Sequence, residues 1–236
     1  MPYIEKRIVS GPMLEIERYA ITDTGRRKPR SPNERPSTEE QQKLNDKNAK
    51  KTISRLANAN FTLNDFFMSV DYAKKIPEAE AKKKLRNYFR KLNALRKKKG
   101  LPQLKYISTT VMKCGKPHHH IIMSGNGMTL DEVEGLWGGD DRINISKLKP
   151  DAFGLEGVAK YLAKQGQSKR RWNSSKNLKK PEITRKIIKR INIYKQPQPP
   201  KGYKIIHTET QDNIYTGPYQ YIVMTKFFTE DRNGGG

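Results

Sequence analysis

The residues in this chain best suited to chemistry are three consecutive histidines, His118, His119 and His120, which precede the apolar residues Ile121 and Ile122. In an extended strand alternate side chains share a face, so His118 and His120 point together while His119 points the other way. Two imidazoles about 7 Å apart along a strand can bind one divalent metal ion. The run therefore predicts either a metal site on His118 and His120 or a surface cluster without a ligand.

A tyrosine and a lysine follow at helical spacing. The segment GLEGVAKYLAKQG, residues 154–166, has the apolar spacing of an amphipathic helix. Tyr161 lies on the flank of its apolar stripe, Lys164 lies about 60° further round, and Gly157 falls between them. This pair offers a nucleophilic phenol beside an ammonium that can neutralise negative charge. By itself the same pattern is also typical of an amphipathic edge residue and a solvated lysine.

The composition indicates a polyanionic partner. Lys and Arg number 48 against 24 Asp and Glu, a formal net charge of +24. Nucleic acid suits such a charge, because each neutralised phosphate releases a condensed counterion. Residues 82–99 form one basic run, and residues 169–190 form a second that also holds a tryptophan able to stack on an unpaired base. The second run is the stronger candidate for DNA contact, through Lys169, Arg170, Arg171, Trp172, Lys176, Lys179 and Lys180.

Several classes of site and location are not expected. Cys114 is the only cysteine, so neither an intramolecular disulfide nor a cysteine-based zinc site can form. No apolar stretch approaches the length of a membrane span, and the first residues lack the apolar block of a secretory signal. We therefore expect a cytoplasmic protein without a membrane partner.

The hydrophobic patterns predict an α+β fold, a central antiparallel β-sheet with flanking helices. Residues 66–72 alternate as a strand, with Asp71 on its polar face. Strands are also expected on either side of a turn at residues 115–117, where a short connection favours an antiparallel hairpin. His119 should then face a helical layer together with Ile121 and Met123. Further helices are predicted at residues 78–99, 129–137 and 155–165, and further strands at residues 142–148 and 185–194.

Composition also suggests three segments. Residues 1–60 form a basic, partly helical N-terminal leader, with a possible hairpin around Gly11 and Pro12 and a helix from Thr38 to about residue 60 that we expect on the surface. Residues 61–195 hold the histidine and tyrosine motifs and are expected to form the catalytic domain. Residues 196–236 begin with the proline-rich KQPQPPKG and form a linker and C-terminal extension.

The order of these motifs resembles that of the HUH endonucleases, specifically the rolling-circle replication initiators of Gram-positive bacterial plasmids and phages. His118-His119-His120 is similar to their His-hydrophobic-His motif, with His119 in the middle position. Tyr161-Leu162-Ala163-Lys164 is similar to their Tyr-x-x-Lys motif, and FFMSVDY resembles their first motif. The resemblance spans about residues 1 to 230.

This resemblance implies a metal-dependent enzyme that nicks and joins single-stranded DNA at a specific sequence or hairpin. Tyr161 would form a covalent 5′-phosphotyrosine, with Lys164 beside the phosphate, and His118 and His120 would hold Mn²⁺ or Mg²⁺. The expected partners are origin DNA and the helicase and polymerase of a bacterial host, because no nucleotide-binding P-loop motif is present. A single candidate tyrosine also implies a transient dimer for the second cleavage.

One departure from the family pattern leaves the identity of the metal ligands open. Many relatives place a glutamate on the strand before the histidines, where this chain has Val111 or a neighbour and no carboxylate. Asp71 is the candidate third ligand; otherwise two histidines, water and substrate hold the ion. Impaired metal binding would instead leave a non-catalytic basic nucleic-acid-binding protein. A relaxase or transposase of the same superfamily is a further alternative, although relaxases commonly place the tyrosine before the histidines and single-tyrosine transposases tend to be shorter.

Overall fold

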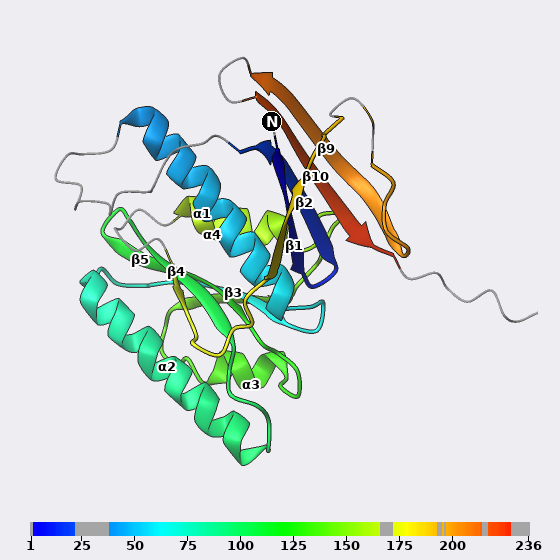
Figure 1. Ribbon diagram of the computed structural model, residues 1–236. Coiled ribbons are helices and arrows are strands. Elements are labelled where there is room, and N and C mark those ends of the chain that lie inside the picture. The colour runs from blue at the N-terminus through cyan, green and yellow to red at the C-terminus, as the bar shows by residue number, and fades with distance from the viewer. Residues whose placement is uncertain are drawn as a thin grey trace, which may run out of the picture. The chain divides into compact units, whose positions relative to one another are not determined.

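The computed structural model describes residues 2–21, 38–165, 172–192, 195, 197–213 and 217–227, with the backbone alone for Lys164, Gln165 and Asn213 (Figure 1). The fold is α+β with antiparallel sheets, as predicted. The chain divides into two compact units. Unit 1 comprises Met1–Leu44, Ala152–Gly154 and Lys180–Gly236, and unit 2 comprises Asn45–Asp151 and Leu155–Lys179. The boundaries predicted after residues 60 and 195 divide the sequence differently and stay a prediction.

Unit 1 is built on a sheet in the order β8-β1-β2-β10-β9. The predicted hairpin is confirmed, because β1 and β2 pair on either side of Gly11, whose φ of 57° suits the tight turn. Leu14 and Ile222 form part of a small apolar cluster on this sheet. The strands are β1 (Tyr3–Ser10), β2 (Met13–Ala20), β8 (Glu182–Ile188), β9 (Tyr203–Asn213) and β10 (Gly217–Lys226).

Unit 2 carries the histidines and contains a second sheet, in the order β6-β3-β5-β4-β7. Strand β5, which bears the histidines, is the central strand of this sheet. The strands are β3 (Phe66–Asp71), β4 (Tyr106–Lys113), β5 (Lys116–Met123), β6 (Arg142–Lys147) and β7 (Asn173–Ser174). The helices are α1 (Glu39–Asn60), whose residues from Asn45 on belong to this unit, α2 (Glu78–Lys98), α3 (Leu130–Gly135) and α4 (Glu156–Gln165). None of the helices described is long and apolar enough to cross a membrane.

Helices cover both faces of this sheet, with α2 and α3 on one side and α1 and α4 on the other (Figure 1). Helix α2 turns an apolar stripe to the sheet because Leu85, Tyr88, Phe89 and Leu92 recur at helical spacing, and all four are buried. Burying each such side chain contributes about 2 kcal/mol. Helix α2 ends at Lys98, and Gly100 follows with a φ of 68°, a left-handed conformation common after helix ends.

Two local predictions were wrong. The hairpin turn predicted at residues 115–117 lies at Cys114 and Gly115, whose φ values of 51° and 76° are both positive. Such turns match the right-handed twist of the flanking strands, so Pro117 continues β5. Helix α1 is not simply a surface helix, because Ile53 and Ala57 are buried against the sheet. At α3 the predicted helix is present, and a capping box between Thr129 and Glu132 stabilises its start.

Candidate metal and nucleophile site

Strand register brings the predicted metal residues to one face of the unit 2 sheet. On the antiparallel neighbours β3 and β5, Asp71 lies opposite His118 and Ser69 lies opposite His120. Directly opposed residues of neighbouring strands share a face, so these four side chains project together. His118, His120 and Asp71 line a pocket of about 580 Å³, and Tyr161 of helix α4 lines it as well. The pocket therefore joins motifs that are far apart in the sequence.

Helix α4 presents Tyr161 because the rest of its sheet-facing side is apolar. Leu155, Ala159 and Leu162 are buried in the cluster that this helix forms with the sheet. Tyr161, on the flank of that stripe, is 43% exposed. Its ring centroid lies 4.9 Å from that of His120, with the planes nearly perpendicular. The phenol thus lies beside an imidazole in an open pocket, where a substrate can reach it.

Phe67 connects the two motifs. Its ring stacks parallel to that of His120 at 6.4 Å and meets the ring of Tyr161 edge-on at 6.3 Å. Aromatic pairs at such distances and angles stabilise one another modestly. Phe67 therefore packs against both His120 and Tyr161.

The carboxylate of Asp71 contacts His118. Oδ1 of Asp71 lies 2.6 Å from Nδ1 of His118. A carboxylate at Nδ1 orients an imidazole and leaves Nε2 as the nitrogen available to a metal. Asp71 Oδ2 has no hydrogen-bond partner among the residues that the structure describes, so it remains a free oxygen donor.

His120 is buried and incompletely satisfied. Burial lowers the pKa of His120, while the nearby Asp71 carboxylate opposes this shift and His118 adds to it. The neutral imidazole, which is the form that binds metals, is therefore favoured. Within the described residues, Nδ1 of His120 is buried and has no hydrogen-bond partner, and the same holds for the hydroxyl of its cross-strand neighbour Thr109. Buried polar atoms without partners are unusual and fit a bound ion or water.

The donors in this pocket suit a divalent metal in type. Two imidazoles, one carboxylate and a hydroxyl supply the nitrogen and oxygen ligands that Mn²⁺ and comparable ions accept. Across the described residues, however, no three or more His, Cys, Asp or Glu side chains converge in a metal-binding arrangement. A metal held here would thus take His118 and His120 and draw further oxygen donors from Asp71, Thr109, water or substrate.

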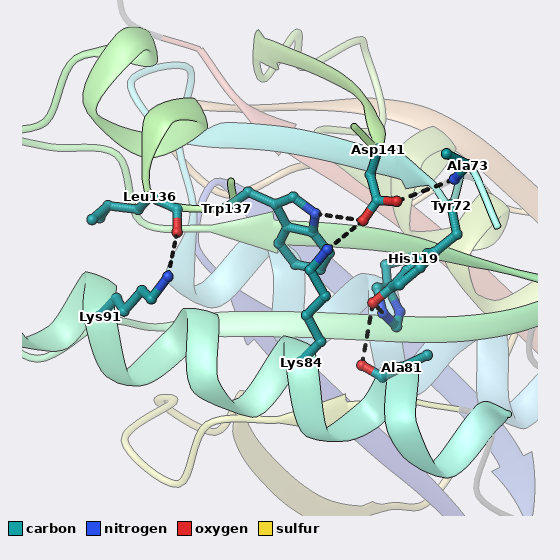
Figure 2. A network of polar contacts seen from close by, with 9 residues as sticks. All are labelled: Tyr72, Ala73, Ala81, Lys84, Lys91, His119, Leu136, Trp137 and Asp141. Carbon is teal, nitrogen blue, oxygen red and sulfur yellow. Dashed lines mark hydrogen bonds and ion pairs between the residues drawn. The ribbon is translucent and has the colours of Figure 1, made fainter. Parts of the chain in front are cut away.

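The third histidine lies on the opposite face and has a structural role. His119 is fully buried, as the prediction of a helical layer requires. Nε2 lies 3.0 Å from the hydroxyl of Tyr72, and Nδ1 lies 3.0 Å from that of Thr110 (Figure 2 shows Tyr72 and His119). Burial lowers the pKa of His119 to about 4, so the ring is neutral near pH 7. Its hydrogen bonds hold the middle of the histidine run in place.

A polar network extends from this point over the edge of the sheet (Figure 2). Burial raises the pKa of Asp141, but contacts from Lys84, Trp137 and the Ala73 amide more than offset this effect and leave the pKa below its usual range. Lys84 Nζ lies 2.6 Å from Oδ2 of Asp141, and the Trp137 indole donates to the same oxygen at 3.0 Å. The network joins α2 to the segment before β6.

The remaining predicted residues are distributed differently. The side chain of Lys164, and Lys169, Arg170 and Arg171 entirely, lie outside the described residues. Trp172 packs partly buried against the apolar cluster under α1 and α4. Lys176, Lys179 and Lys180 are exposed.

Some pocket residues were missed at the level of sequence. Phe67 and Ser69 share the face of Asp71 by the alternation of the strand, but nothing in the sequence indicates a role for them. Nothing in the sequence marks Thr109 as a pocket residue; only the strand register, which places it opposite His120, does so. Lys113 also lines the pocket and brings a positive charge to it. The alternation that located Asp71 also points to Phe67 and Ser69 on the same strand, whereas Thr109 and Lys113 of β4 are identified only by the strand register.

Comparisons with known proteins leave the function to be argued from these residues. No protein-family model matches the chain, and no curated protein matches it. Among solved structures, it is similar to the crystal structure of the hypothetical protein ORF119 from Sulfolobus islandicus rod-shaped virus 1, at 16% identity and a TM-score of 0.39. That similarity covers 51% of this chain and 96% of the viral one.

Proposed function

We propose that this protein is a rolling-circle replication initiator of the HUH type, which nicks and rejoins single-stranded DNA through Tyr161. The observation that carries the proposal is the position of the Tyr161 ring, 4.9 Å from the ring of His120 in one pocket with His118 and Asp71. The net charge of +24 supports a DNA substrate.

In the proposed reaction, the Tyr161 hydroxyl oxygen attacks a backbone phosphorus. A bond forms between that oxygen and phosphorus, and the bond from phosphorus to the 3′ oxygen breaks. The phenolic proton is lost and one proton is gained by the departing oxygen, which becomes a 3′-hydroxyl. The 5′ phosphate stays on Tyr161 as a phosphodiester, so a later attack by a 3′-hydroxyl reverses the step and joins the strands. Lys113, with Lys164, is suited to neutralise the phosphate.

His118 and His120 would hold the divalent ion, Mn²⁺ or Mg²⁺. Bound there, it would supply Lewis-acid polarisation of the phosphate. Asp71 orients His118 through Nδ1, and to serve as the third donor it would exchange this contact for the metal. Phe67 keeps the phenol against His120, which limits the positions that the nucleophile can adopt.

The proposed setting follows from the same chemistry. The substrate would be single-stranded or hairpin origin DNA in a bacterial cytoplasm, with helicase and polymerase supplied by the host. Among the described residues that line this pocket, Tyr161 is the one tyrosine, so closing the nicked circle would require a second subunit in a transient dimer.

Denaturing gel electrophoresis with labelled hairpin DNAs tests the proposal. The purified protein is mixed with a library of hairpins and Mn²⁺, beside the variants Tyr161→Phe and His120→Ala. We expect an adduct that survives denaturation with the unaltered protein, none with Tyr161→Phe, and little with His120→Ala. Binding to every hairpin without an adduct under any divalent metal would favour the non-catalytic nucleic-acid-binding alternative.

A further inference from the structure

We propose that a second pocket of unit 2, on the sheet face opposite the Tyr161 pocket, binds the phosphodiester backbone of single-stranded nucleic acid. The pocket has a volume of about 750 Å³ and lies between α2, β4 and residues 175–177. Its floor includes Tyr106, which opposes Met123 across the strands and so shares the face of His119, away from His120. The choice of DNA as the nucleic acid rests on the proposed function. The pocket and its positive charge are observed independently of that function.

The walls of this pocket are held by hydrogen bonds within the protein. The Asn93 side chain accepts from the amide of Leu104 at 2.9 Å, which ties α2 to the following loop. Asn177 donates its side-chain amide to the carbonyl of Gln103 at 3.1 Å. Ser175 Oγ accepts from the amide of Tyr106 at 3.1 Å. The hollow is therefore formed before any ligand arrives, which lowers the entropic cost of binding.

Its charge is positive and uncompensated. Arg86, Arg90 and Lys176 line the pocket and are exposed, and the described residues that line it include no carboxylate. None of the three has an ion-pair partner among the residues that the structure describes. Guanidinium groups recognise phosphate oxygens with paired hydrogen bonds, so two arginines one helical turn apart suit a phosphodiester strand.

Several lysines on α2, in contrast, have partners within the protein. Lys84 is paired with Asp141 at 2.6 Å, and Lys82 with Glu78 at 2.6 Å. Lys91 donates to the carbonyl of Leu136 at 3.2 Å. Figure 2 shows Lys84 and Lys91 reaching the segment around α3 and β6, whereas Arg86 and Arg90 lie on the pocket side of the same helix. Lys84 and Lys91 thus have partners on the side of α2 that faces α3 and β6, whereas Arg86 and Arg90 have no ion-pair partner among the described residues.

The remaining lining suits the other parts of a nucleotide. Phe89 and Tyr106 stack at 3.9 Å and give the pocket an aromatic floor. Asn87 and Gln103 add amides that can donate to or accept from a base edge. Aromatic surface beside arginines is the combination by which proteins hold unpaired strands without strict sequence preference. A purely acidic peptide would use the arginines but not the aromatic floor.

The test measures binding without chemistry. A Tyr161→Phe protein in EDTA is titrated into labelled oligothymidylate and followed by fluorescence anisotropy. In that background, Arg86→Ala/Arg90→Ala is compared with Lys83→Ala/Lys98→Ala, which removes the same charge from exposed positions of α2 outside the pocket. We expect the arginine pair to weaken binding about tenfold and to reduce the salt slope by about 1.4, and the lysine pair to weaken it by about twofold.

A second variant adds a negative charge to the lining of this pocket. Gln103→Glu keeps the size of an exposed side chain and adds a negative charge, so we expect it to weaken binding about threefold with both arginines intact. Equal losses for the arginine and lysine pairs would overturn the proposal. Competition by polyglutamate as strong, charge for charge, as by oligothymidylate would also overturn it. The adduct experiment is independent of both results, because these proteins lack the nucleophile and the metal.

Discussion

Oδ1 of Asp71 lies 2.6 Å from Nδ1 of His118, its direct neighbour across β3 and β5. The contact makes Asp71 part of the candidate metal site through an imidazole that it orients, whatever its second oxygen does.

Replacing Asp71 with asparagine should weaken metal binding. The amide keeps the size of the side chain but loses the charge that orients His118, and loss of such a partner typically costs about 10- to 100-fold in metal affinity. The measurement is the Mn²⁺ concentration that half-saturates adduct formation, with Asp131→Asn, on the exposed surface of α3, as the control. Equal Mn²⁺ requirements in the two variants would contradict a role for Asp71.

Two adjacent threonines of β4 should respond oppositely to replacement by valine. The Thr109 hydroxyl is buried without a partner among the described residues, so Thr109→Val should raise the free energy of unfolding by about 1 kcal/mol. The Thr110 hydroxyl is bonded to His119, so Thr110→Val should lower it by about 1 kcal/mol. Urea unfolding of the metal-free protein measures both. A loss of stability in Thr109→Val would show that its hydroxyl is satisfied in solution.

His119 should make the stability of the fold depend on pH. Its pKa is about 4 in the folded chain, against an ordinary value of 6.5 that we expect once the chain unfolds, so the unfolded chain binds the extra proton between these values. Stability is then fully present above pH 6.5 and falls as the pH drops towards 4, by about 3 kcal/mol. Urea unfolding at several pH values in this range measures the free energy of unfolding, which should change less with pH in His119→Leu than in the unaltered protein. Parallel curves would contradict a buried neutral His119.

Phe67→Ala should slow the chemical step more than it weakens DNA binding. Removing the ring frees both His120 and Tyr161, and misplacing a nucleophile by about 1 Å can cost about 100-fold in rate. Single-turnover adduct formation at saturating DNA should therefore fall by about 10- to 100-fold, with little change in the dissociation constant. Val158→Ala, which also changes the pocket lining but removes no ring, should have a smaller effect.

Much of unit 2 could be predicted from the sequence because its signals are local. Alternation along β3 placed Asp71 and Phe67 on one face, and the histidine run placed His118 and His120 together, as the register confirms. The proximity of Tyr161 to His120 was expected only from the family resemblance, since no local pattern relates residues so far apart in the chain.

What the sequence did not predict depends on distant pairing. Strand β10 joins β2 to β9, and β8 pairs with β1, so the unit 1 sheet combines both ends of the described chain. Weak alternation at residues 3–20 and tyrosine-rich segments after residue 203 do not reveal such a partnership. The partnerless hydroxyl of Thr109 likewise follows from packing around it and not from its neighbours in sequence.

The most direct test of the central claim is to map the DNA-linked residue. After the reaction with Mn²⁺ and a cleavable hairpin, nuclease and protease digestion followed by mass spectrometry should locate a residual 5′ nucleotide on the peptide containing Tyr161. Fragmentation should assign it to the Tyr161 oxygen, and Tyr161→Phe should yield no modified peptide. A nucleotide attached to any other residue, or cleavage that persists in Tyr161→Phe, would contradict the assignment of Tyr161 as the nucleophile.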